Sequence, residues 1–164
     1  MPKENAKLAK IDRIDRAILD ALQKDGSLTN QQLAERVGLS PSPCSRRVRA
    51  LEDAGVILRR VTLLERKALG LSLTVIIQIG MDRHTPERFE QFEQQMATFP
   101  EVQELYLITG QEADYMVKAV VPDMDEYQAF LLNKVTRIPG VSGVHSSFVL
   151  RRVIDNTELP LGYV

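Results

Sequence analysis

Two kinds of hydrophobic spacing divide this chain into two parts. From Asp12 to Gly55, apolar residues recur every three to four positions, as they do on one face of an α-helix. From Leu71 to Gly80, apolar and polar residues alternate, which is typical of a strand with one buried face. The period changes between these two stretches, so we predict two domains, at residues 1–65 and 66–164.

The N-terminal part is predicted to contain three short helices with a tight turn between the last two. Thr29 and Gln32 have the spacing of a capping box, so the second helix is expected to begin there. Gly38 can end that helix, and Ser40 followed by Pro41 is a typical start for the third. Two helices joined in this way form a helix-turn-helix, a motif that binds the major groove of DNA.

The third helix is predicted to have one apolar face and one face rich in hydroxyl and guanidinium groups. Cys44, Val48 and Leu51 repeat at helical spacing and should pack inward. Arginine can bind guanine through two hydrogen bonds or hold a phosphate, so the opposite face suits double-stranded DNA. A helical bundle with a solvated arginine face is the plainer alternative, and the agreement of caps, turn and face disfavours it. The predicted DNA-binding residues are Ser40, Ser42, Ser45, Arg46, Arg47 and Arg49.

The C-terminal part is predicted to alternate strands with helices in the order βαββαβ. Strands are expected at 71–80, 102–108, 115–121 and 141–154, and helices are expected to begin at 85–86 and 122–123. Residues 99–105 and 138–144 share a pattern, and each lies where a helix is followed by a strand. Two βαβ halves of this kind form the ferredoxin-like plan, so the predicted fold class is α+β.

Residues 56–64 follow the third helix and are predicted to be extended. This segment carries Arg59 and Arg60, which can contact backbone phosphates as a wing beside the helix-turn-helix. A solvated strand edge explains the two arginines equally well.

Charge is distributed unevenly along the chain, although its formal net charge is only −1. Residues 1–66 hold 13 basic and 9 acidic side chains, a balance of +4, whereas residues 67–164 hold 8 and 13, a balance of −5. A basic half beside an acidic half suits a nucleic-acid binder with a separate sensing or assembly domain.

Composition argues against several classes of protein. No apolar run approaches the length of about 18 residues that crosses a membrane. A single cysteine excludes an intramolecular disulfide and fits a reducing compartment, so we expect a cytoplasmic protein. The two histidines, His84 and His145, and the lone Cys44 are too few for a metal cluster. No phosphate-binding glycine loop and no nucleophile–base pair appear, so we expect no metal, no cofactor and no enzymatic activity.

Residues in both parts match one known family. In the N-terminal part they are Asp12-Arg13-Ile14-Asp15, Ile18-Leu19, Leu22-Gln23-Lys24-Asp25-Gly26, Leu33, Val37-Gly38-Leu39-Ser40-Pro41, Cys44, Arg47-Val48, Leu51-Glu52 and Gly55-Val56-Ile57. In the C-terminal part they are Leu69-Gly70, Thr109-Gly110, Asp114-Tyr115, Val121-Pro122-Asp123-Met124 and Pro139-Gly140-Val141. Over nearly its whole length the chain therefore resembles the leucine-responsive regulatory protein/AsnC family of transcription regulators.

The resemblance implies a winged helix-turn-helix, a hinge, and a ferredoxin-like βαββαβ domain that binds amino acids and mediates assembly. The implied partners are double-stranded DNA, an amino-acid effector and further copies of the same chain. In this family dimers commonly associate further, as tetramers of dimers, and DNA can wrap around the octamer.

The turn Thr109–Tyr115 is the predicted effector site. Successive amides in a turn can hold a carboxylate, and Asp114 can accept hydrogen bonds from an ammonium group. An ordinary hairpin turn explains the local sequence as well, because glycine and aspartate are favoured there. The resemblance favours the binding site, since the family binds amino acids at a matching turn between dimers. The predicted effector residues are Leu107, Gly110, Gln111, Glu112, Asp114, Met124, Ser146, Ser147 and Phe148.

The turn departs from the family pattern in one respect. Three residues separate Gly110 from Asp114, where the family usually has two. A leucine-like effector is the first expectation, and a basic amino acid that meets Glu112 is the second. Two other functions remain open on the sequence: an architectural DNA-binding protein with little effector response, and an amino-acid-binding enzyme subunit, which the arginine face disfavours.

Overall fold

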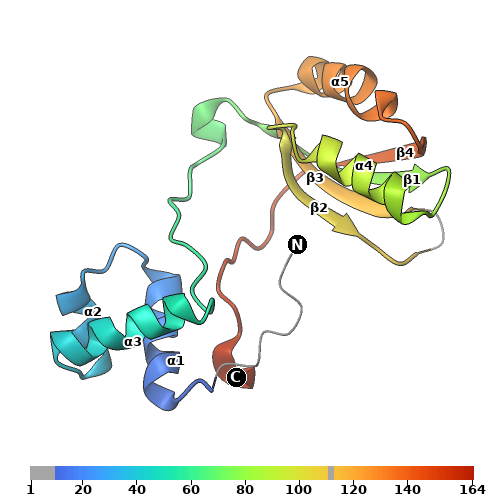
Figure 1. Cartoon of the computed structure of the whole chain (residues 1–164). Coiled ribbons are helices and arrows are strands. Elements are labelled where there is room, and N and C mark those ends of the chain that lie inside the picture. The colour runs from blue at the N-terminus through green and yellow to red at the C-terminus, as the bar shows by residue number, and fades with distance from the viewer. Residues whose placement is uncertain (1–9, 111–112) are drawn as a thin grey trace. The chain divides into compact units, whose positions relative to one another are not determined.

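The computed structural model of the chain describes residues 10–110 and 113–164. They form two compact units, which we call the helical unit and the sheet unit (Figure 1). The helical unit contains residues 10–63 together with residues 154–164, and the sheet unit contains residues 64–110 and 113–153. No helix in the described ranges is long and apolar enough to cross a membrane.

Three helices make up the core of the helical unit: α1 (Arg13–Lys24), α2 (Asn30–Val37) and α3 (Pro41–Asp53). They form where the sequence predicts them, because α1 and α2 begin at a capping side chain and α3 begins at a proline. Asp12 caps α1 with its carboxylate, and Thr29 and Gln32 form the predicted capping box of α2. Gly38 ends α2 in the left-handed conformation, with φ of 71°, which glycine adopts without strain.

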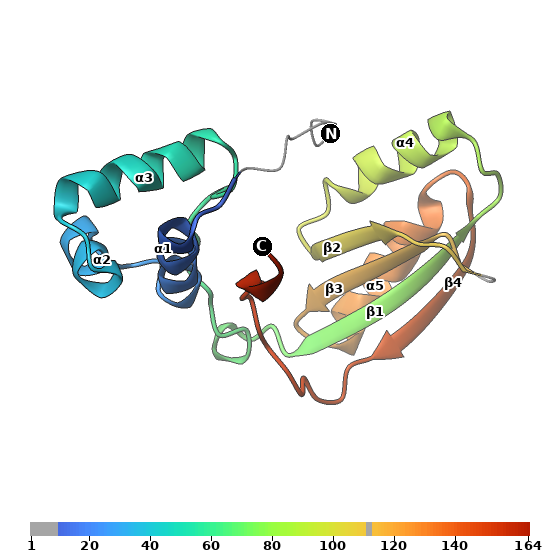
Figure 2. The same ribbon diagram turned by 90° about the horizontal axis from the view of Figure 1, so that it is seen from below.

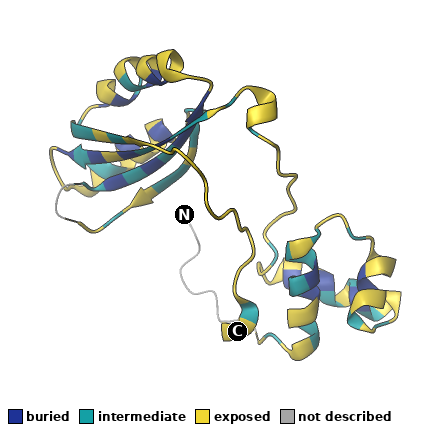
Figure 3. Cartoon of the chain, turned by 180° about the vertical axis from the view of Figure 1, so that it is seen from behind, coloured by how far each residue is buried: buried dark blue, intermediate teal, exposed yellow. Residues whose placement is uncertain are grey.

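The apolar faces of these helices meet in one buried cluster (Figure 3). Ile18 from α1 and Leu33 from α2 are almost completely buried. The three residues predicted to face inward from α3 are buried with them: Cys44, Val48 and Leu51. The predicted inner face of α3 is therefore confirmed, and this packing determines which face of the helix remains in solvent.

The sheet unit follows the predicted order βαββαβ. Its elements are β1 (Leu73–Met81), α4 (Pro86–Met96), β2 (Val102–Leu107), β3 (Tyr115–Val121), α5 (Met124–Asn133) and β4 (Val141–Phe148). Short 3₁₀ helices lie at Lys67–Leu69, Val135–Arg137 and Leu161–Tyr163. The sheet is antiparallel in the order β2-β3-β1-β4 (Figure 2), which confirms the ferredoxin-like topology.

Both helices of the sheet unit pack on one face of the sheet. Phe92 from α4 and Phe130 from α5 join a single core cluster with the alternate residues of β1 that include Val75 and Ile77. Alternation therefore leaves the other residues of each strand on the opposite face. Among them, Ile76 is only half-buried.

The last strand is shorter than predicted. It was expected to continue to residue 154, but β4 ends at Phe148, which pairs with Val75. One further hydrogen bond follows, from the Val149 N–H to the Thr74 carbonyl at 3.0 Å, and β1 itself begins at Leu73. A strand ends where its neighbour ends, because the backbone beyond has no ladder partner.

Two segments that flank the sheet unit in the sequence contain no strand and no α-helix. Residues 58–65 contain no strand or helix and are largely exposed, so the predicted extended segment makes no ladder. Residues 154–164 belong to the compact helical unit, where the side-chain amide of Gln23 donates to the Leu159 carbonyl at 3.1 Å and accepts from its N–H at 2.9 Å. Arg16 also donates to the carbonyl of Val164. The tail therefore packs against α1, an arrangement that its sequence, which has no clear period, did not predict.

Candidate DNA-binding face and effector turn

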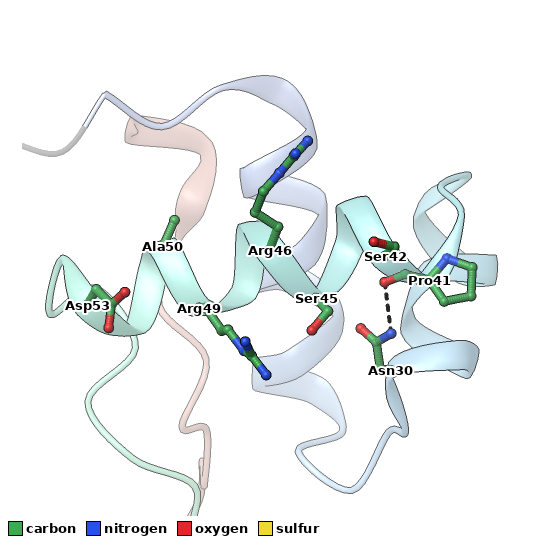
Figure 4. Close-up of a pocket in the computed structure, with 8 residues that line it drawn as sticks. All are labelled: Asn30, Pro41, Ser42, Ser45, Arg46, Arg49, Ala50 and Asp53. Carbon is green, nitrogen blue, oxygen red and sulfur yellow. Dashed lines mark hydrogen bonds between the residues drawn. The ribbon is translucent and has the colours of Figure 1, made fainter.

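The exposed face of α3 forms a shallow groove of about 690 Å³ (Figure 4). The residues that line it are Asn30, Pro41, Ser42, Ser45, Arg46, Arg49, Ala50 and Asp53. Ser42, Arg46 and Arg49 are exposed and Ser45 is half-buried. Four of the six predicted DNA-binding residues thus lie together on one surface, because the apolar stripe of α3 faces the core.

The groove has a polar, basic end and an acidic end. Arg46 and Arg49 extend from the middle of α3, and Ser42 and Ser45 lie toward its N-terminus (Figure 4). Asp53 lies at the C-terminal end, where its carboxylate would repel phosphate. The N-terminal half of the helix is therefore the part suited to a nucleic acid.

Asn30 is a residue of this surface that the sequence did not single out. Its side-chain amide donates to the Pro41 carbonyl at 2.8 Å (Figure 4), which joins the start of α2 to the start of α3. The only local signal that could have identified Asn30 is its position directly after the Thr29 cap, because a residue in the first turn lies at an exposed helix end. This hydrogen bond helps to fix the position of α3 relative to α2.

Arg47 lies outside the groove and contacts α1 instead. Its Nη1 is 2.7 Å from Oδ2 of Asp12 and 2.7 Å from Oδ1 of Asp15. Hydrogen bonds to Asp15 and then to Asp12 raise the pKa of the Arg47 guanidinium above its ordinary value. The backbone N–H of Asp15, followed by the Arg47 side chain, lowers the pKa of Asp12. The sequence grouped Arg47 with the DNA-binding residues, whereas the structure joins it to the N-terminal cap of α1.

Ser40 lies directly before α3, and Cys44 lies near the start of the helix. Ser40 is the N-cap residue and is exposed, but its side chain makes no capping hydrogen bond and does not line the groove. Cys44 is fully buried, and burial raises the pKa of its thiol. A buried thiol with a raised pKa is a packed core group with little thiolate available for reaction.

The predicted effector turn is centred on Asp114, whose side chain is only 21% exposed. Its Oδ2 accepts from the Met81 N–H at 2.7 Å, and its Oδ1 lies 2.7 Å from Nε2 of His84. The backbone of Asp114 donates to the Ile79 carbonyl at 3.0 Å and accepts from the Ile108 N–H at 2.8 Å. These bonds fix the carboxylate at the end of the sheet where β1 ends and β3 begins.

Other predicted effector residues divide between the two ends of this sheet. Leu107 ends β2 and is 57% exposed, and Gly110 follows it in the same turn as Asp114. Gln111 and Glu112 lie outside the described residues. Met124 begins α5 just after β3. The last residue of β3 pairs with the first residue of β1, so Met124 lies at the other end of the sheet from Asp114. The nine residues of β1 span the distance between the two ends, which is roughly 26 Å of strand.

The remaining predicted residues lie on β4. Ser146 hydrogen-bonds to the hydroxyl of Tyr127, and the Phe148 ring packs edge-on to the Tyr127 ring with centroids 5.3 Å apart. Ser147 is exposed and alternates to the opposite face of the sheet. One chain therefore does not bring the predicted effector residues into a single pocket.

The sequence also missed His84 as a partner of Asp114. Local sequence shows only a histidine directly before the Thr85 cap of α4. The contact depends on the pairing of β1 with β3, which brings residues thirty positions apart to one corner. Across the described parts of the chain, no group of three or more His, Cys, Asp or Glu side chains is placed to hold a metal ion.

A helix-turn-helix that presents arginines, followed by a separate ferredoxin-like domain, defines the class of two-domain DNA-binding transcription regulators. Residues 11–57 match the family model described as winged helix-turn-helix DNA-binding. Residues 74–159 match the one described as the Lrp/AsnC ligand binding domain. The chain belongs to the Lrp/AsnC family of transcription regulators, which confirms the resemblance seen in the sequence.

Similar proteins are found along almost the whole chain. The leucine-responsive regulatory protein of Escherichia coli K12 is 42% identical over 149 residues, which cover 91% of this chain and 90% of that protein. A transcriptional regulator of Neisseria meningitidis, solved as a complex with L-methionine, is 38% identical, with a TM-score of 0.88 over 93% of this chain and 97% of that one. An AsnC family regulator of Agrobacterium tumefaciens is 40% identical, with a TM-score of 0.87 over 93% and 98%.

Proposed function

We propose that this protein regulates transcription in response to an amino acid, without enzymatic activity and in the cytoplasm. Residues 1–65 bind double-stranded DNA, and residues 66–164 bind the effector and assemble several copies. The observation that carries the proposal is the groove on α3, where two arginines and two serines form one exposed surface.

The arginines of the groove are suited to DNA because no ion pair joins Arg46 or Arg49 to another described residue. By contrast, Arg47 pairs with two carboxylates, and Arg60 lies 3.4 Å from Glu52. An unpaired guanidinium on a solvent-facing helix can bind guanine or phosphate without first breaking an internal contact. Ser42 and Ser45 add hydroxyl donors and acceptors to the same half of the helix.

An assembly of several copies follows from both candidate sites. One recognition helix contacts only a few base pairs, so two half-sites about one helical turn apart require at least a dimer. The effector residues of one chain lie at opposite ends of its sheet, so a pocket that uses both sets needs a second copy. The sheet face opposite α4 and α5 also carries half-buried Ile76 and Met116, two apolar side chains that a second copy could cover. We propose a dimer that associates further into a tetramer of dimers.

The proposed effector is an amino acid whose ammonium group binds Asp114. Support comes from the match to a ligand-binding domain and from the Neisseria relative that was solved with L-methionine. A leucine-like or methionine-like ligand is the first candidate. A basic amino acid is the second, because Glu112 lies in the same turn of the sequence.

Two measurements test the proposal. A thermal-shift screen of the full chain against the twenty amino acids should show a rise in Tm for at least one, since a ligand that binds only the native state stabilises it. Selection from a random-sequence duplex library should then recover a preferred DNA site. No shift with any amino acid, together with DNA binding of little sequence preference, would favour the architectural function instead. No DNA binding at all would contradict the proposal.

A further inference from the structure

The carboxylate of Asp114 has a partner on each oxygen within its own chain. Oδ2 accepts the Met81 N–H at 2.7 Å, and Oδ1 lies 2.7 Å from Nε2 of His84. Each carboxylate oxygen can accept two hydrogen bonds, so a ligand's ammonium group would compete with the partner that lies in its path. The Met81 N–H is part of the strand backbone and is fixed, so His84 is the partner that can be replaced.

His84 is held loosely compared with the group it covers. Its side chain is 68% exposed, whereas that of Asp114 is 21% exposed. The ring has one packing neighbour from α4, Phe89, whose centroid is 5.9 Å away in an edge-on arrangement. His84 therefore lies on the solvent side of the carboxylate and can turn away without opening the core.

The turn does not need His84 for its own structure. The Asp114 N–H to the Ile79 carbonyl and the Ile108 N–H to the Asp114 carbonyl hold the backbone, and Met81 holds the carboxylate. The contact of His84 with Asp114 therefore adds little to the fold, although it lies on the carboxylate that we propose binds the ligand.

We propose that His84 occupies, in the ligand-free protein, the position on Asp114 that the ammonium group of an amino acid takes. The imidazole is an intramolecular competitor, and the effector binds by displacing it. This inference rests on the proposed function of Asp114 as the ammonium acceptor. It adds a residue that sets effector affinity.

Two groups face the His84 ring. Asp114 contacts it from the β3 side, and the uncharged Phe89 packs on it from α4. The nearby charges on the segment after β1 and on α4 are Arg83 and the pair of Arg88 with Asp82, whose atoms are 3.2 Å apart.

Isothermal titration calorimetry on the full chain tests the proposal, with L-methionine, L-leucine and L-lysine as probes. His84→Ala should bind its amino acid about two- to fivefold more tightly than the wild type, the effect expected for loss of an exposed polar contact. His84→Gln keeps an N–H donor, so it should still compete and should bind more weakly than His84→Ala.

His145→Ala is the matched control, because it removes the other histidine, which is exposed on β4. It should leave affinity unchanged. Weaker or equal binding by His84→Ala, with measurable binding by the wild type, would overturn the competitor while leaving the amino-acid site in place. Binding of no probe by either the wild type or His84→Ala would overturn both the competitor and the effector function proposed for Asp114.

Discussion

The two candidate sites of this protein differ in how much of each a single chain builds. The DNA-binding face is continuous, because Ser42, Ser45, Arg46 and Arg49 project from one short helix. The candidate effector residues instead come from two ends of a sheet, with one group near Asp114 and another around Tyr127. A site on one helix face follows from helical spacing, whereas a site shared between strands depends on tertiary pairing and on a second copy.

Replacing the arginines of the groove should have the largest effect on DNA binding. Arg46→Ala and Arg49→Ala should each weaken binding of the selected duplex by about 1–3 kcal/mol if they contact bases. Fluorescence anisotropy at several salt concentrations distinguishes base from phosphate contacts, because loss of a phosphate contact weakens all sequences alike and lowers the salt dependence. Arg137→Ala, which removes an exposed arginine from the sheet unit, is the control and should bind normally. Unchanged affinity in the double variant would mean that another surface of the helical unit binds DNA.

Arg47 sharpens the comparison within a single helix. Because its guanidinium joins Asp12 and Asp15, Arg47→Ala should lower the Tm of the protein more than Arg46→Ala does. Its effect on DNA affinity, measured well below the Tm, should be smaller than that of Arg46→Ala. Arg47→Lys should recover only part of the stability, since an ammonium group lacks the planar fork. A large loss of DNA affinity in Arg47→Ala without a change in Tm would restore Arg47 to the DNA-binding residues.

A pH series tests the same contact from the carboxylate side. The pKa of Asp12 is lowered from its ordinary value of 3.8, so its contribution to stability is complete above that value. That contribution should be lost as the pH falls through the lowered pKa of the folded state. Urea unfolding between about pH 5 and pH 2 measures it. In Asp12→Asn the decline in stability over this range should be shallower than in the wild type, and an identical decline would contradict the assignment.

The smallest expected effect concerns the tail. Gln23→Ala removes two hydrogen bonds to the backbone of Leu159 and should lower the free energy of unfolding by about 1 kcal/mol. Gln31→Ala, an exposed glutamine of α2, is the matched control. Hydrogen exchange of the Leu159 amide gives the direct readout and should become faster only in Gln23→Ala. If both variants exchange alike, the tail does not rest on α1 in solution.

The elements that were predictable from the sequence are those that local chemistry specifies. Helical period and caps identified all three N-terminal helices, since Thr29, Gly38 and Pro41 act on their own first or last turn. Strand alternation likewise identified the βαββαβ order. By helical spacing alone, Arg47 lies beside the exposed face of α3, where a DNA-binding residue would also lie. Only the packing of α3 on α1 shows that Arg47 pairs with Asp12 and Asp15.

Features that depend on distant partners were not predictable. The end of β4 is set by where β1 begins, and the contact of His84 with Asp114 is set by the pairing of β1 with β3. The tail docks through backbone groups of Leu159, which leave no pattern in the side chains. Each of these features requires the register or the tertiary fold before it can be seen.

The central claim is that one protein binds DNA through α3 and changes that binding when an amino acid reaches Asp114. The most direct test compares DNA affinity with and without the amino acid found in the thermal screen, for the wild type and for Asp114→Asn. Asparagine keeps an oxygen for the Met81 N–H but loses the charge. We predict a change of about fivefold or more in the wild type and none in the variant, with equal affinities when the amino acid is absent. An equal response in both proteins would contradict the central claim.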